Sequence, residues 1–173
     1  MDTALHEIIV TPENIPAWIC LHKPGTADVA PHWHESIELI CSLDSRLDIL
    51  RSGRMIHLPE YDVAVINNCE IHAVVPVSGY RNHGISITFD SSYFKDKCPD
   101  IETPFFEFTD HEDVRKEIAE SMKRMHQLYL KPSESRFLNL EVNSLLMHIS
   151  YCLLSYFLVS HSETIKKNNT RRY

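Results

Sequence analysis

Two histidines and a glutamate within residues 31–40 have side-chain types and a spacing suited to binding chemistry. The stretch reads Pro-His-Trp-His-Glu-Ser-Ile-Glu-Leu-Ile, and we predict one strand from about His34 to Leu43. Side chains alternate between the two faces of a strand, so His32, His34 and Glu38 are predicted to point to the same side. The opposite side is apolar. This pattern predicts a pocket lined by histidine and glutamate.

A third imidazole, that of His72, follows the turn at residues 67–70 and can reach the same space. Three imidazoles and a carboxylate suit a divalent metal such as zinc, iron, manganese or nickel. The same groups can instead bind a small polar molecule, because neutral imidazole both donates and accepts hydrogen bonds. A buried Glu38 carboxylate requires a metal, a ligand or a protonated histidine as its partner. The residues alone leave these alternatives open.

Two further side chains are candidates for lining the pocket. His83 alternates in phase with Ile85, Ile87 and Phe89, so it is predicted to point inward, as a hydrogen-bonded core residue or as the pocket floor. Trp18 either forms an apolar wall of the pocket or packs in the core. The other histidines have no partner at a useful spacing and are interpreted as surface or incidental residues: His6, His22, His57, His111, His126, His148 and His161.

Composition and charge exclude several classes of function. The net charge of −7 over 173 residues has the wrong sign for a surface that neutralises phosphates, so this chain alone is not expected to bind nucleic acid. No run approaches the about 20 apolar residues that span a bilayer, and no secretion signal is apparent at the N-terminus. The five cysteines are scattered without a Cys-x-x-Cys pair and are interpreted as reduced thiols. We therefore expect a cytoplasmic protein without membrane contact.

Short β-type segments fill the first ninety residues, and helical periodicity follows. The segments are separated by proline, glycine and asparagine, which predicts a sandwich or barrel. Residues 91–94 fit one helical turn. Thr109 and Glu112 then fit a capping box that begins an amphipathic helix, and Lys131 to Ser133 ends it.

Residues 137–159 are apolar around more than one side of the second predicted helix, which indicates burial on two sides. One side is expected to pack on the barrel and the first helix. The other side is expected to contact a second subunit, with burial inside a single domain as the alternative. The predicted subunit contacts are Leu138, Leu145, Ile149, Cys152 and Tyr156.

The spacing of these motifs is similar to that of the cupin superfamily. Gly25, then His32-x-His34-x-x-x-Glu38, then residues 61–72 ending in His72 resemble the two cupin motifs. The resemblance implies a small jelly-roll β-barrel that encloses the four polar residues. The chain departs from the usual glycines and proline of these motifs, which resembles the relaxed pattern of cupins that bind organic ligands. The departures are at Ser45, Tyr61, Asn67 and Cys69.

The order of segments along the whole chain resembles the N-terminal half of bacterial AraC-type transcription regulators. That resemblance implies a cupin barrel at residues 1–108, a two-helix antiparallel hairpin for homodimerisation at 109–160 and a basic linker at 161–173. The barrel would sense a small polar or sugar-like effector without requiring a cofactor. DNA would be bound by a C-terminal domain that this chain lacks, which suggests an excised regulatory domain. The alternative is a metal-dependent cupin enzyme of the dioxygenase or isomerase class.

Overall fold

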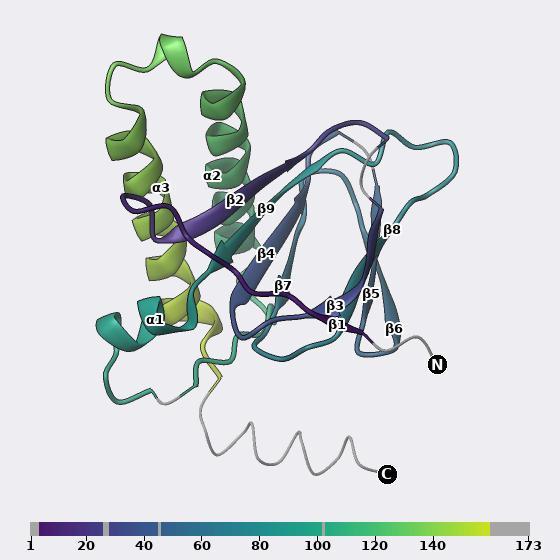
Figure 1. Cartoon of the computed structure of the whole chain (residues 1–173), viewed down its shortest axis with the longest axis horizontal. Coiled ribbons are helices and arrows are strands. Elements are labelled where there is room, and N and C mark those ends of the chain that lie inside the picture. The colour runs from purple at the N-terminus through teal and green to yellow at the C-terminus, as the bar shows by residue number, and fades with distance from the viewer. Residues whose placement is uncertain (1–3, 26–27, 45, 102, 160–173) are drawn as a thin grey trace.

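The computed structural model describes residues 4–25, 28–44, 46–101 and 103–159, which form two β-sheets and a layer of helices (Figure 1). None of the described helices is long and apolar enough to cross a membrane. The predicted linker at 161–173 lies outside the described residues. The strands are β1 Leu5–His6, β2 Ala17–His22, β3 Val29–Trp33, β4 Ile37–Ser42, β5 Leu47–Arg51, β6 Arg54–Leu58, β7 Val63–Ile66, β8 His72–Val75 and β9 Gly84–Phe89.

The strand order is that of a jelly roll. One sheet has the order β2-β9-β4-β7 and the other β1-β3-β8-β5-β6. From β2 to β9 the chain changes sheet at every connection except the β5–β6 hairpin, so each sheet collects non-consecutive strands, as in a double-sheet jelly roll. Within the described residues no ladder joins the two sheets, so the predicted barrel is an open sandwich with β1 added parallel to β3.

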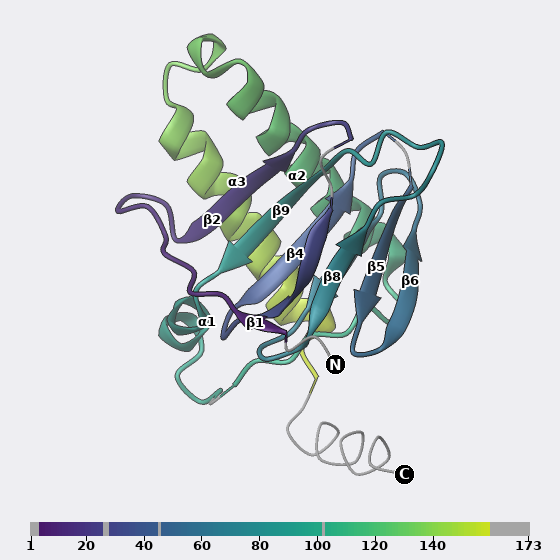
Figure 2. The same cartoon turned by 45° about the vertical axis from the view of Figure 1, so that its right-hand side comes forward.

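The helices are α1 Ser91–Lys97, α2 Glu112–Leu130, the short η1 Pro132–Glu134, α3 Leu138–Cys152 and the π-helical turn η2 Leu153–Phe157. Helices α2 and α3 lie side by side over the outer face of the β2-β9-β4-β7 sheet (Figure 2). They bury an apolar row of that sheet, in which Ile87 of β9 shares one core cluster with Ile118 of α2 and Ile149 of α3. A smaller apolar cluster lies between the two sheets. The larger apolar core therefore lies between the helices and the outer face of one sheet. The space between the two sheets holds only the smaller cluster and can accommodate a cavity.

The predicted helices are corrected in two respects. Helix α1 is longer than the single turn predicted at 91–94, so the described chain has three α-helices and not two. The capping box is absent, because Thr109 is not the N-cap of α2. That helix begins at Glu112 after His111, which has a left-handed backbone (φ 45°) and makes no side-chain cap hydrogen bond.

The predicted subunit contacts, which lie on α3 and η2, are wrong for two residues. Ile149 and Cys152 are 0% and 1% exposed and pack in the domain's own core, so they are unavailable to a second subunit in this fold. Leu138 and Leu145 are partly buried against the same core, and only Tyr156 is exposed. The large apolar side chains that α3 exposes are instead Leu140, Met147 and Tyr151. When a helix has apolar residues on every side, its sequence does not predict which side packs on the sheet of the same domain.

Candidate functional site

The sequence predicts one strand for the histidine-rich stretch, and this is wrong. In the structure the stretch crosses from one sheet to the other. His32 is in β3 of one sheet, Glu38 is in β4 of the other, and His34 lies in the connection between them. His72 is in β8 and directly opposite His32 in the antiparallel ladder. The four side chains meet inside the sandwich because they approach from facing sheets.

The Glu38 carboxylate is at the centre of the cluster. Its Oε2 accepts hydrogen bonds from Nε2 of His34 at 3.2 Å and from Nε2 of His72 at 2.9 Å. His34 and His72 are each 1% exposed, and Glu38 is 8% exposed. With His32, these residues place four potential donor atoms within 4.8 Å of one another. The structure therefore brings together all four residues that the sequence selected.

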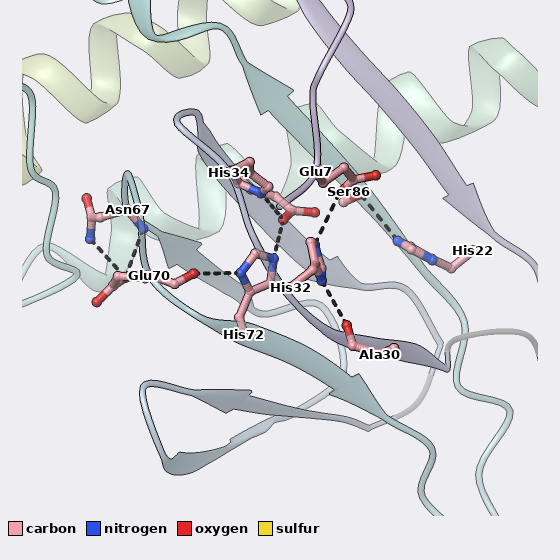
Figure 3. Close-up of polar contacts among 10 residues, drawn as sticks. Glu7, His22, Ala30, His32, His34, Asn67, Glu70, His72 and Ser86 are labelled. Atoms are coloured by element: carbon pink, nitrogen blue, oxygen red, sulfur yellow. Dashed lines mark hydrogen bonds and ion pairs between the residues drawn. The ribbon is translucent and has the colours of Figure 1, made fainter. Parts of the chain in front are cut away.

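Backbone carbonyls orient two of the imidazoles (Figure 3). Nδ1 of His72 donates to the carbonyl oxygen of Glu70 at 3.0 Å, and Nδ1 of His32 donates to that of Ala30 at 2.9 Å. In both rings Nε2 is thereby directed toward the cluster. Nε2 of His32 also lies 3.3 Å from Oε2 of Glu7, on the segment that follows β1.

Charge in the cluster is concentrated on Glu38 and His72. Burial alone would raise the pKa of Glu38, but the hydrogen bonds from His34 and His72 outweigh it and hold that pKa far below its usual value. Burial alone would lower the pKa of His72, but its hydrogen bond to Glu38 raises it. An ionised carboxylate is thus stabilised by imidazole N–H groups at a largely buried position.

A cavity of about 260 Å³ adjoins this cluster between the two sheets. One wall carries His32 of β3 and His72 of β8, and the facing wall carries Glu38 of β4 together with residues of β2 and β9. The other lining residues are Glu7, Ile9, Trp18, Cys20, His22, Val29, Ile40, Val74, Ser86 and Thr88. The cavity therefore combines charged, hydroxyl and apolar groups.

Trp18 lines this cavity while remaining 47% exposed, so it forms a wall and is not packed in the core. His22, which the sequence interpretation treated as incidental, also lines the cavity and lies 3.2 Å from the hydroxyl of Ser86. Burial lowers the pKa of His22, which favours its neutral form. The alternation of Trp18, Cys20 and His22 along β2 is the signal that could have identified it.

His83 does not line the cavity, so of the two predicted alternatives the pocket floor is wrong. The row containing Ile85, Ile87 and Phe89 faces the helices, whereas the row containing Ser86 and Thr88 faces the cavity. His83 accordingly lies on the helical side. Its Nδ1 is 3.1 Å from Oδ2 of Asp44, and its Nε2 is 3.2 Å from Nε2 of His126 on α2. His126, interpreted as incidental from the sequence, is 8% exposed.

The chemistry of the four-residue cluster also fits a divalent metal. Two donors about 2.1 Å from a metal and 90° apart are about 3.0 Å from each other, close to the 2.9 and 3.2 Å separations around Glu38. Nitrogen and oxygen donors of this kind suit iron, manganese, nickel or zinc. The ligands would be Nε2 of His32, His34 and His72 and Oε2 of Glu38.

Comparison with known proteins gives a likeness in structure and no match in sequence. No protein-family model matches the sequence, and no curated protein matches it significantly. Among solved structures, the chain is similar to a Cupin 2 conserved barrel domain protein from Salinispora arenicola CNS-205, at 18% sequence identity and a TM-score of 0.40. The match covers 54% of this chain and 81% of the other. The jelly roll is identified by the strand order of the two sheets alone.

Proposed function

We propose that this chain is the effector-binding and dimerisation domain of an AraC-type transcription regulator, and that a small polar molecule binds in the cavity against Glu38. The observation that carries the proposal is the buried Glu38 carboxylate, held by hydrogen bonds from His34 and His72 beside a cavity of about 260 Å³. That volume is below the about 300–1,000 Å³ typical of drug-sized ligands, so the cavity suits a small metabolite.

The lining favours a molecule with several hydroxyl or amino groups. Glu38 can accept from such groups, and the hydroxyls of Ser86 and Thr88 on the adjacent strand β9 can donate or accept. Trp18 offers an apolar aromatic face at the cavity wall, and the apolar face of a sugar ring can stack against such a surface. A sugar, polyol or amino sugar meets these requirements better than a purely apolar molecule.

The position of the helices supports coupling between the cavity and dimerisation. Strand β9 presents Ser86 and Thr88 to the cavity and Ile87 to α2 and α3. A ligand that binds better to one arrangement of this strand would shift the helices toward the matching arrangement. The outer face of α3, with Leu140 and Met147, is the surface proposed for pairing two copies. DNA would be bound through a domain outside this chain.

The test is thermal unfolding with a panel of aldoses, polyols and amino sugars. At least one should raise the melting temperature of the wild type, because a ligand that binds only the folded state stabilises it. Glu38→Gln should remove this shift, whereas Glu60→Gln, which changes an exposed carboxylate, should retain it. A shift that persists in Glu38→Gln would refute the assignment of the pocket. No shift with any member of the panel would reject the proposed ligand class.

A metal-dependent cupin enzyme is the second candidate, favoured by the convergence of four donor atoms within 4.8 Å. A divalent metal held there would supply a Lewis acid. The chain's own contribution would be to orient the imidazoles of His32 and His72 through the backbone carbonyls described above. Elemental analysis of protein purified without a histidine tag or chelator separates the candidates. One equivalent of metal, lost in a His34→Ala/Glu38→Ala variant, would favour the enzyme over the sensor.

A further inference from the structure

A second cluster of metal-binding side chains lies on the helical pair, away from the cavity. Glu117 is on α2, and His148 and Cys152 are one turn apart on α3. Nε2 of His148 is 3.6 Å from Oε2 of Glu117 and 3.8 Å from Sγ of Cys152. All three potential donor atoms lie within 4.8 Å of one another. The cluster therefore joins the two helices at one point.

The thiol and imidazole form a long sulfur hydrogen bond, and both separations are close to those around a tetrahedral metal. An imidazole and a carboxylate 3.6 Å apart make no strong hydrogen bond. With Zn–N and Zn–O of about 2.1 Å and Zn–S of about 2.3 Å, tetrahedral geometry places N and O about 3.4 Å apart and N and S about 3.6 Å apart. The observed distances exceed these values by only about 0.2 Å.

We propose that Glu117, His148 and Cys152 form a zinc site that fastens α2 to α3. Zinc accepts this mixture of carboxylate, imidazole and thiolate donors, and three protein ligands leave one position for water. The site is open to solvent on one side, since the side chains of Glu117 and His148 are 58% and 44% exposed, whereas Cys152 is buried.

Binding would replace the thiol proton of Cys152. Burial, followed by the nearby charge of Glu117, raises the pKa of Cys152, so the metal-free side chain is a neutral thiol at neutral pH. Zinc forms a Zn–S bond as the S–H bond is lost, and one proton is released to solvent for each ion bound. Because its ligands come from both helices, the ion would stabilise the folded arrangement of the pair.

The experiment uses Co²⁺ as a spectroscopic probe of the full chain under reducing conditions. We expect a thiolate-to-cobalt charge-transfer band that Zn²⁺ abolishes on displacing Co²⁺. Cys20→Ser is the matched control, because Cys20 is a free thiol that lines the cavity near the other donor cluster. The band should persist in Cys20→Ser and disappear in Cys152→Ser.

Cys152 is buried, so Cys152→Ser could lose the band by misfolding. Substitutions of two exposed ligands test the site without this problem. His148→Gln should also abolish the band, and Glu117→Gln should weaken Co²⁺ binding by at least about tenfold. Circular dichroism should match the wild type in both variants, since the two side chains are largely exposed. A band that is lost in Cys20→Ser, or retained in His148→Gln, would overturn the proposal. Absence of any thiolate band in the wild type at saturating Co²⁺ would overturn it as well.

Discussion

Two neighbouring positions on α3 provide a direct test of which side of this helix belongs to the domain core. Ile149 is 0% exposed and shares the core cluster between helices and sheet, whereas Met147 is 52% exposed. We expect Ile149→Ala to destabilise the chain strongly and Met147→Ala to change the free energy of unfolding of the monomer very little. The two substitutions lie on the same helix, so a difference between them reflects burial and not helix propensity.

The size of the effect follows from the burial of Ile149. Truncating a fully buried isoleucine to alanine removes its transfer free energy and leaves a cavity, at a cost of about 2–5 kcal/mol. A value of about 3 kcal/mol corresponds to a fall in melting temperature of about 6–12 °C for a domain of this size. An exposed substitution such as Met147→Ala is expected to stay within about 0.5 kcal/mol.

The assays are urea unfolding followed by circular dichroism and sedimentation equilibrium at matched protein concentrations. Matched concentrations are required because association contributes to apparent stability. Met147→Glu should raise the dimer dissociation constant by at least about tenfold while the subunit remains folded. The reasoning would be refuted if Ile149→Ala cost less than about 1 kcal/mol while weakening dimerisation. A monomeric wild type would refute the proposed pairing surface.

Two further predictions concern pH and backbone packing. Burial, followed by the charge of His83, lowers the pKa of His126. At this residue the unfolded chain therefore binds more protons, so His126 destabilises the fold as pH decreases from about 7 to about 5, and the urea midpoint at pH 5 relative to that at pH 7 should be higher in His126→Gln than in the wild type. At Gly84, an added Cβ would lie 2.7 Å from the carbonyl oxygen of Cys41 and 2.8 Å from Cδ1 of Leu47. Gly84→Ala should therefore cost about 1–3 kcal/mol in urea unfolding, and an unchanged midpoint would contradict this packing.

The sequence predicted the members of the polar cluster correctly but placed them on the wrong element. Alternation along one strand put His32, His34 and Glu38 on a common face. In the structure His32 and Glu38 lie on opposite sheets, and both face the space between them. A single strand and a crossing between facing sheets can bring the same residues together, so the spacing identified the site without identifying its architecture.

The pocket lining on β9 could not be assigned from alternation alone. Both rows of this strand are buried, because one is covered by the helices and the other by the facing sheet. Alternation separates the row of Ile85 and Ile87 from that of Ser86 and Thr88 but does not say which row faces inward. The helical layer buries the apolar row, which puts His83 on the helical side and leaves the hydroxyl row facing the cavity.

This arrangement makes β9 a strand that borders both the cavity and the helical core. The strand is paired on both edges, with β2 and β4, so it is held firmly within the sheet. Its Thr88 lines the cavity, and the next residue, Phe89, belongs to the core that contains Ile118 of α2. A packed core responds to a shift of one element by moving its neighbours, because it contains few voids to absorb the change. Under the proposed sensing function, a ligand that displaces Thr88 would disturb the helical core through Phe89, whose ring lies 5.3 Å from those of Tyr93 and Phe94 on α1.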